Sequence, residues 1–356
     1  MLQKPFYDPQ KSYEENYENG PFGVFQNKKL YKNSSPPKYN FHGYRVNLPF
    51  GIPAGPLLNS KFVKGAFEKG FDIAVYKTIR TRFFPCHPFP NILSLSLTEN
   101  LTLKRAKTPL IATSDYGEPL SITNSFGVPS KDPSLWQEDV EKAVSYAQEG
   151  QILVLSFMGT IKKDQTPKEF LEDFSLAAKL SNETNAKILE ANLSCPNIGN
   201  EGLVCYDLNM TRKITEKIRR KIGNKPLILK VGYYQNNSDL EELARIAHDY
   251  SVSIASINTI PGIIVNKNGS QALPGNVARL RSGVCGSAIK WAGIDQVKRL
   301  KTIREKNDYK FFIEGVGGVM NPDDYHAYKN TGADSVMSAT GSMWNPLLAQ
   351  EIKETL

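Results

Sequence analysis

One short stretch of the sequence, residues 190–197 with the letters EANLSCPN, brings two amide side chains and a thiol together. It begins as an apolar strand and continues into a loop that Pro196 stiffens. A lone cysteine is usually a small buried apolar residue. Cys195, however, follows a polar strand end, precedes a proline and stands between Asn192 and Asn197. This setting favours a reactive thiol.

Polar side chains also stand at the ends of several expected strands. Lys77 ends the second expected strand, Asn192 the fourth, Lys230 the fifth and Asn258 the sixth. A buried lysine is costly unless it meets an anion or a polar ligand. One such lysine would more often neutralise a carboxylate or reach solvent. Two lysines and two asparagines at equivalent strand ends favour a binding site.

Two glycine-bearing turns follow the seventh and eighth expected strands, EGVGG at 314–318 and ATG at 339–341. Glycine lets the backbone approach a ligand, and the first N–H groups of a helix bind anions. Tight turn geometry explains either turn alone equally well. The loops after the last two strands are, however, the usual phosphate site of an α/β barrel. Together the turns predict a phosphate-bearing ligand, and neither has the spacing of a dinucleotide or Walker loop.

Short apolar runs alternate with helical patterns from about residue 47 onward, and they predict the elements that position these residues. Several runs are continuous, as in parallel strands buried on both faces. Eight strands joined by helices favour a closed (β/α)₈ TIM barrel, of class α/β, over an open sheet. Strands are expected at 51–54, 73–77, 152–156, 188–192, 227–231, 254–258, 310–314 and 335–339, and helices for example at 167–180, 209–222, 240–250 and 323–330.

Three segments depart from this alternation. Residues 78–151 and 259–309 interrupt the strand spacing, and we interpret them as long loop insertions at the C-terminal rim, where barrel active sites lie. Residues 1–45 contain ten aromatic residues, unlike most disordered tails. The sequence therefore predicts an ordered N-terminal extension, 1–45, that packs on a barrel domain, 46–356.

Composition narrows the class of protein. Hydrophobic residues make up 40% and charged residues 22%, as in soluble globular proteins. We expect no transmembrane segment and no secretory signal, because no apolar run is long enough. The four cysteines form no C-x-x-C pair, so we expect no metal site and a reducing, cytoplasmic location. The net charge of +8 comes from dispersed basic residues, which argues against nucleic acid and suits an anionic substrate.

The loop NLSCPN resembles the active-site loop of dihydroorotate dehydrogenases, in whose soluble class the cysteine is the base. Further motifs of that family follow in the same order within residues 47–352. They are PAG at 53–55, VYKT at 75–78, NSFGVP at 124–129, LKV at 229–231, INT at 257–259, GVCG at 283–286, GVGG at 315–318 and AT at 339–340. The resemblance implies an FMN-dependent TIM barrel that oxidises dihydroorotate to orotate in pyrimidine biosynthesis.

The resemblance also implies a role for each matched residue. Cys195 would be the catalytic base, Lys77 would offset the substrate's negative charge, and Lys230 would stabilise the reduced flavin. The residues implied to bind the substrate are Lys77, Asn124, Phe126, Gly127, Val128, Asn192, Asn197, Asn258 and Thr259. Those implied to bind the cofactor are Ala54, Gly55, Lys77, Thr78, Ser156, Asn192, Lys230, Ile257, Gly286, Gly315, Gly317, Gly318, Ala339 and Thr340.

Some positions depart from the family pattern and keep other functions open. Phe126 stands where methionine is usual and Ala339 where glycine is usual. Residues 1–45 have no counterpart in the soluble class, and the loop at 80–93 is unusual for the family. A related flavin enzyme acting on dihydrouracil or another dihydropyrimidine is one alternative, and a flavin-binding protein without turnover is another. The resemblance further implies a homodimer and an electron-transfer partner, with fumarate, a quinone or NAD as the final acceptor.

Overall fold

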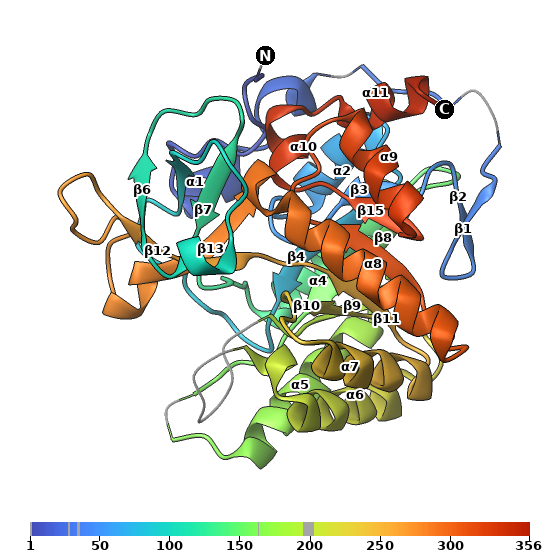
Figure 1. The fold of residues 1–356 in the computed structure, drawn as a ribbon. Helices are drawn as coiled ribbons and strands as arrows, with labels where there is room; N and C mark the ends of the chain where they lie inside the picture. Colours follow the sequence, from blue (N-terminus) through green and yellow to red (C-terminus); the bar gives the residue numbers. More distant parts are fainter. Residues whose placement is uncertain (1, 28, 34–35, 163, 195–202) are drawn as a thin grey trace.

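Eight parallel strands close into a barrel at the centre of the protein. The computed structural model describes residues 2–27, 29–33, 36–162, 164–194 and 203–356. Every strand of this large barrel pairs in parallel with both neighbours, and β15 returns to β3 to close the ring (Figure 1). In ring order the strands are β3 (Phe50–Ile52), β4 (Ile73–Ile79), β8 (Ile152–Phe157), β9 (Ile188–Asn192), β10 (Leu227–Val231), β11 (Ser253–Ser256), β14 (Ile313–Val316) and β15 (Ser335–Met337).

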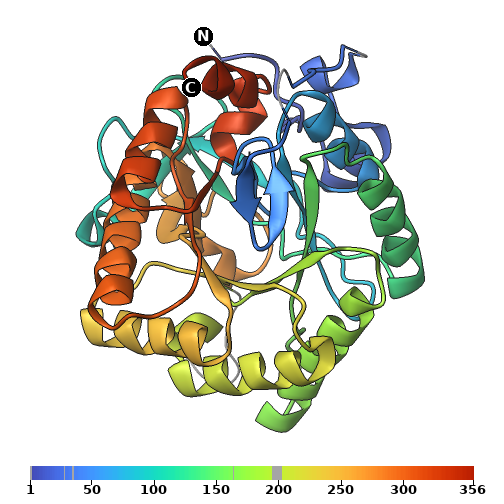
Figure 2. The same cartoon turned by 90° about the vertical axis from the view of Figure 1, so that its right-hand side faces the viewer.

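Helices surround the strands, as Figure 2 shows. The predicted (β/α)₈ barrel is confirmed, because each of the eight expected strands overlaps an observed one. The seventh begins at Ile313, three residues later than expected. The helices around the barrel are α2 (Ser60–Glu68), α4 (Pro133–Ser145), α5 (Pro167–Asn182), α6 (Leu208–Ile222), α7 (Asn237–Asp249), α8 (Lys290–Lys306), α9 (Pro322–Thr331), α10 (Thr340–Trp344) and α11 (Leu348–Glu354).

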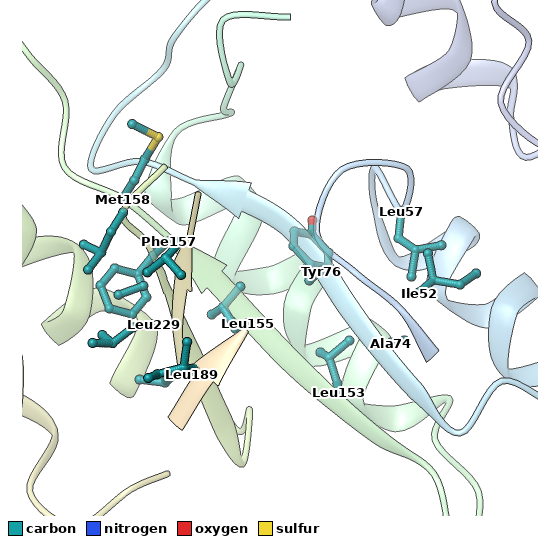
Figure 3. Close-up of a cluster of buried hydrophobic side chains, with 14 of the residues drawn as sticks. Ile52, Leu57, Ala74, Tyr76, Leu153, Leu155, Phe157, Met158, Leu189 and Leu229 are labelled. Atoms are coloured by element: carbon teal, nitrogen blue, oxygen red, sulfur yellow. The ribbon is translucent and has the colours of Figure 1, made fainter. Parts of the chain in front are cut away.

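Successive strand residues point alternately into the barrel and out toward the helices. On β4, Ile73 and Val75 belong to the apolar interior, while Ala74 and Tyr76 belong to the layer under the helices. The Tyr76 hydroxyl donates a hydrogen bond to Asp139 of α4 (2.7 Å). Figure 3 shows members of this outer layer on β3, β4, β8, β9 and β10. Burial on both faces explains why the strands read as unbroken apolar runs.

The two long insertions meet and form a second, smaller closed barrel, which the sequence analysis had not predicted. One insertion follows β4 and the other follows β11, so the small barrel stands at the C-terminal rim of the large one (Figure 1). All its strand pairs are antiparallel except β6 with β12. It consists of β5 (Ile92–Leu95), β6 (Pro109–Thr113), β7 (Ser121–Asn124), β12 (Ile260–Val265) and β13 (Arg281–Gly286), with the short helices α3 (Leu103–Ala106), η3 (Val277–Leu280) and η4 (Ser287–Ile289).

A β-hairpin covers the opposite, N-terminal end of the large barrel (Figures 1 and 2). It consists of β1 (Tyr39–Phe41) and β2 (Tyr44–Val46), and it buries Phe41 and Val46 among the interior side chains. At its tip, His42 Nε2 lies 3.1 Å from Oε1 of the buried Glu314. The hairpin therefore closes this end of the barrel with the apolar side chains of Phe41 and Val46 and adds the polar contact between His42 and Glu314.

Residues 2–26 pack on the barrel with little regular structure beyond α1 (Tyr13–Asn19) and η1 (Gly23–Gln26). Phe6 is fully buried, stacks on Phe25 at a centroid distance of 4.2 Å and meets Phe62 of α2 edge-on at 6.3 Å. Its N–H donates to the carbonyl of Met343 in α10 (3.3 Å). Among the described residues, no helix combines the length and apolarity that a membrane crossing requires.

We predict that Phe6→Ala lowers the free energy of unfolding by about 3–5 kcal/mol, the usual cost of emptying a buried phenylalanine site. Urea denaturation measures the change. Leu135→Ala is the control, because Leu135 lies on α4 with 57% of its surface exposed, and it should change stability by less than about 0.5 kcal/mol. Equal stability of Phe6→Ala and the wild type would contradict the packing described for this segment.

Candidate active site

Two lysines lie inside the C-terminal half of the large barrel. Lys77 and Lys230 are 7% and 4% exposed. On β10, Lys230 stands opposite Asn192 of β9 and Ala255 of β11 in the strand register. Within the part of the chain that the structure describes, the Lys77 ammonium donates no hydrogen bond and joins no ion pair. The pKa of Lys77 is lowered to about 8, chiefly by burial and to a smaller extent by the charge of Arg80, while Cys86 acts in the opposite direction.

A chain of hydrogen bonds connects three polar side chains of neighbouring strands. The hydroxyls of Thr78 and Ser156 are 3.0 Å apart, and Ser156 donates to Oε1 of Glu190 (2.7 Å). The register of β4 against β8 shifts between Tyr76 and Ile79. This irregularity allows Thr78, the residue after Lys77, to face Ser156. Burial raises the pKa of Glu190, while the charge of Lys230 lowers it. Glu190 is thus a buried acid that partly balances Lys230.

The segment from Asn124 to Val128 leaves β7 half-exposed at the rim. Asn124 Nδ2 lies 3.4 Å from Cys285 Sγ, and this thiol donates to the carbonyl of Ile122 (3.7 Å). Gly127 and Val128 have φ values of 74° and 52°, so the chain turns sharply there. Arg80 holds this turn, because its guanidinium donates to the carbonyls of Gly127 (3.0 Å) and Val128 (2.8 Å).

Phe126 faces the N-terminal segment. Its ring meets Tyr7 edge-on at 5.7 Å and Tyr13 at 6.1 Å. The Tyr7 hydroxyl is buried and has no hydrogen-bond partner among the described residues. Tyr7 and Tyr13 of the N-terminal segment therefore pack against the predicted substrate loop. The sequence analysis did not predict this contact.

The predicted phosphate turns contain glycines with different roles. Gly317 and Gly318 have φ values of 120° and 70°, as the turn after β14 requires. Gly315 lies within β14, and a Cβ there would come within 2.3 Å of the Tyr328 ring on α9. Close packing against α9 is therefore a sufficient reason for glycine at position 315, and its predicted contact with the cofactor stays a prediction. Ala339 is the half-exposed N-cap of α10, and Thr340 is its first residue.

Gly55 offers open space at the rim. A Cβ added there would meet no atom within 4 Å, and the φ of 141° disfavours other residues. The neighbouring Ala54 is also half-exposed after β3. Bare backbone next to open space is what a flat ring system needs at a strand end, so these residues fit a flavin.

The remaining predicted residues gather at the ends of β9 and β11 or in the small barrel. Ile257 is buried, while Asn258 and Thr259 are half-exposed where the chain leaves β11. Gly286, at the end of β13, has a φ of 94° and lies against the Leu120 carbonyl. Cys195 and Asn197 lie outside the described residues. Just before them, the Ser194 hydroxyl is 3.4 Å from the Lys230 carbonyl, at the same rim.

A cavity of about 1080 Å³ lies far from this rim, at the N-terminal end of the large barrel. It is lined by His42, Tyr250, Phe312 and several charged residues. Charged side chains in its wall pair with one another, as Arg304 does with Asp334 (2.6 Å). Within the described ranges, no three His, Cys, Asp or Glu side chains gather as metal ligands do. The unpaired Lys77 and the open space at Gly55 therefore favour the C-terminal rim as the candidate site.

The chain is similar in sequence to known proteins of one family. Residues 106–356 match the family model described as dihydroorotate dehydrogenase. A dihydroorotate dehydrogenase of Dictyostelium discoideum is 37% identical over 98% of this chain and 97% of its own length. The catalytic subunit of dihydroorotate dehydrogenase B (NAD(+)) from Maridesulfovibrio salexigens is 30% identical over 52% of this chain and 58% of that protein. The corresponding subunit from Staphylococcus carnosus is 24% identical over 70% of this chain and 74% of that protein.

We predict that Lys77→Met stabilises the protein below pH 8 when no substrate is added. The folded-state pKa of Lys77 is about 8, below the ordinary value of 10.5, so its buried charge costs stability at low pH. As pH rises from 8 to 10.5 the folded protein releases this proton and the cost disappears. The gain should be on the order of 3 kcal/mol at pH 6.5 and smaller at pH 9.5, measured by urea denaturation.

Lys69→Met is the matched control. Lys69 is 1% exposed, but its ammonium donates to both the carbonyl and the side-chain oxygen of Asn27 and to the carbonyl of Lys29. Its removal should destabilise the protein, because those acceptors lose a donor. If Lys77→Met is as destabilising as Lys69→Met at pH 6.5, Lys77 has a partner in the fold.

Proposed function

The chain belongs to the dihydroorotate dehydrogenase family and is an oxidoreductase, and we propose that it oxidises dihydroorotate to orotate with FMN as hydride acceptor and Cys195 as general base. The family is generally flavin-dependent. Those assigned site residues that the structure describes lie on the strand ends and the two rim insertions, at the end of the barrel where active sites of this fold occur, and this supports the proposal.

Lys77 is the observation that favours dihydroorotate over dihydrouracil as the substrate. Its ammonium is buried at the rim, and no described carboxylate pairs with it. An anionic ligand would supply the missing countercharge, and the carboxylate of dihydroorotate is such a group. Dihydrouracil has no carboxylate, so this lysine favours the acid over the neutral pyrimidine.

The residues present fit FMN as the cofactor. Ala54 and Gly55 provide an open backbone surface, and Gly317, Gly318 and the start of α10 provide turns for a phosphate. FMN, when bound, supplies the hydride acceptor. Lys230, held in the barrel near Glu190, would stabilise negative charge on the cofactor.

The substrate would be oriented by amide side chains and deprotonated by a thiolate. Asn124, Asn192, Asn197 and Asn258 offer both donors and acceptors, as the planar ring of the substrate does. Cys195 would remove the proton from C5 while the hydride leaves from C6. A thiol of ordinary pKa near 8.5 is a workable base close to neutral pH.

We also propose that the protein is a cytoplasmic homodimer that passes electrons to a separate acceptor. Sedimentation equilibrium tests the dimer, because a monomer mass would contradict it. Reoxidation of the reduced flavin by fumarate, by a quinone and by NAD in separate assays tests the acceptor.

The first test is an anaerobic titration of the purified protein. We predict a yellow protein with one non-covalent FMN whose absorbance bleaches on addition of dihydroorotate and much less with dihydrouracil. A colourless folded protein that FMN does not restore contradicts the cofactor assignment. Bleaching by dihydrouracil alone favours the alternative substrate, and a flavin that neither compound reduces favours a binding protein without turnover.

A second prediction concerns the base. Cys195→Ser should keep FMN and orotate affinity but slow flavin reduction by about 10²–10⁴-fold at neutral pH, the usual contribution of a positioned base. Because serine has a far higher pKa, the remaining activity should rise toward alkaline pH. Stopped-flow bleaching from pH 6 to 10 measures both effects.

Cys205→Ser is the control for that experiment. Cys205 is fully buried, its thiol accepts the N–H of Gly232 (3.4 Å), and burial raises its pKa to about 12. This variant should lose stability and reduce its flavin at the wild-type rate. A wild-type rate in Cys195→Ser would show that another group is the base.

A further inference from the structure

The guanidinium of Arg279 lies buried between the two rim insertions. Arg279 belongs to η3, in the insertion after β11, and is 4% exposed. Its side chain reaches into the other insertion and donates to the carbonyls of Pro88 (3.0 Å) and Pro90 (3.3 Å). It also donates to the carbonyl of Pro274 in its own insertion. One side chain thus joins segments that are almost 200 residues apart in sequence.

The same guanidinium holds Ser125 by two further hydrogen bonds. Arg279 Nε donates to the Ser125 hydroxyl (3.1 Å), and Nη2 donates to the Ser125 carbonyl (3.0 Å). Asn91 Nδ2 also donates to this carbonyl (3.2 Å). Ser125 stands between Asn124 and Phe126, so its position sets the course of the predicted substrate loop.

The chemistry of these contacts requires arginine. A guanidinium has five N–H groups in a rigid fork, whereas a lysine ammonium donates from a single point. The acceptors are carbonyl and hydroxyl oxygens, and no carboxylate among the described residues forms an ion pair with Arg279. A buried cation is costly, and this one is held entirely by the neutral groups of the loops that it joins.

We propose that Arg279 is a positioning residue that fixes the loop from Asn124 to Val128 for substrate binding. The role rests on the proposed function, because it assumes that this loop contacts dihydroorotate. Arg279 itself touches loop backbone and Ser125, and it acts on the substrate through Asn124 and its neighbours.

The test compares Arg279→Lys with the wild type as FMN-loaded enzymes. Lysine keeps the charge but cannot span all the acceptors. We expect KM for dihydroorotate and Kd for orotate to rise together by about ten- to a hundredfold, the usual effect of a small displacement of binding groups. We expect kcat to change by less than about threefold. Amide hydrogen exchange should accelerate in residues 84–91 and 121–130.

Arg219→Lys is the matched control. The Arg219 guanidinium also binds only backbone carbonyls among the described residues, those of Tyr250 (2.8 Å), Gly223 (3.1 Å), Lys225 (2.7 Å) and Ser251 (2.6 Å). It lies at the N-terminal end of the barrel, beside the start of β10. Arg219→Lys should lower the melting temperature without changing KM, Kd or exchange at the rim. Equal effects of the two variants on KM would show that Arg279 contributes only to general stability, and this result would overturn the proposal.

Ser125→Ala separates the contacts further and covers the case in which Arg279→Lys does not fold. Of the Arg279 contacts it removes only the bond from Nε, together with the 3.3 Å contact between the Ser125 hydroxyl and His87 Nδ1. KM and Kd should therefore rise in the same direction by a smaller factor. Wild-type KM, Kd and rim exchange in both variants would overturn the proposal, and so would wild-type values in Ser125→Ala if Arg279→Lys fails to fold. If the wild type neither binds orotate nor is reduced by dihydroorotate, the proposed function fails, and the exchange rates alone then decide whether Arg279 holds this loop.

Discussion

The closure of eight parallel strands is the constraint on which the rest of the molecule depends. A closed parallel barrel leaves no strand edge unpaired, and it brings every strand's carboxyl end to the same rim. Lys77, Asn192, Lys230 and Asn258 come together for that reason, although the chain separates them by up to 181 positions. The hairpin at the other end buries Phe41 and Val46 among the interior side chains, so the barrel interior is closed there.

Three buried positive charges lie at or near that rim, on Lys77, Lys230 and Arg279. Burying a cation without compensation is unfavourable, and the fold compensates each one differently. Arg279 has a ring of loop oxygens, Lys230 has the nearby carboxylate of Glu190 without a hydrogen bond to it, and Lys77 has neither within the described chain. Arg279 is therefore satisfied by the fold, whereas both lysine ammonium groups lack an acceptor among the described residues, in agreement with the ligand-binding roles proposed for them.

The sequence predicted the large barrel and its polar strand ends because both depend on local patterns. Continuous apolar runs identify strands buried on two faces, and a polar residue at the end of such a run must lie at the rim. The small barrel escaped prediction because its strands are short and because the two pairings that close it, β6 with β12 and β7 with β13, join distant parts of the sequence. Arg279 gave no local signal either, since its partners are backbone carbonyls of another insertion. The contact of Tyr7 with Phe126 is equally remote, and Cys195 remains an assignment from its motif.

The small barrel has a consequence for how the chain acquires its structure. Thr123 of β7 bonds Gly283 of β13, 160 residues further along. Strand β5 can pair with β6 and β7 as soon as they are synthesised, but β6 and β7 each lack one neighbour until β12 and β13 exist. Contacts of such long separation form slowly. The small barrel above the candidate active site is therefore among the last parts to assemble. A nascent or truncated chain that ends before residue 260 exposes its unpaired strands to aggregation or to chaperones.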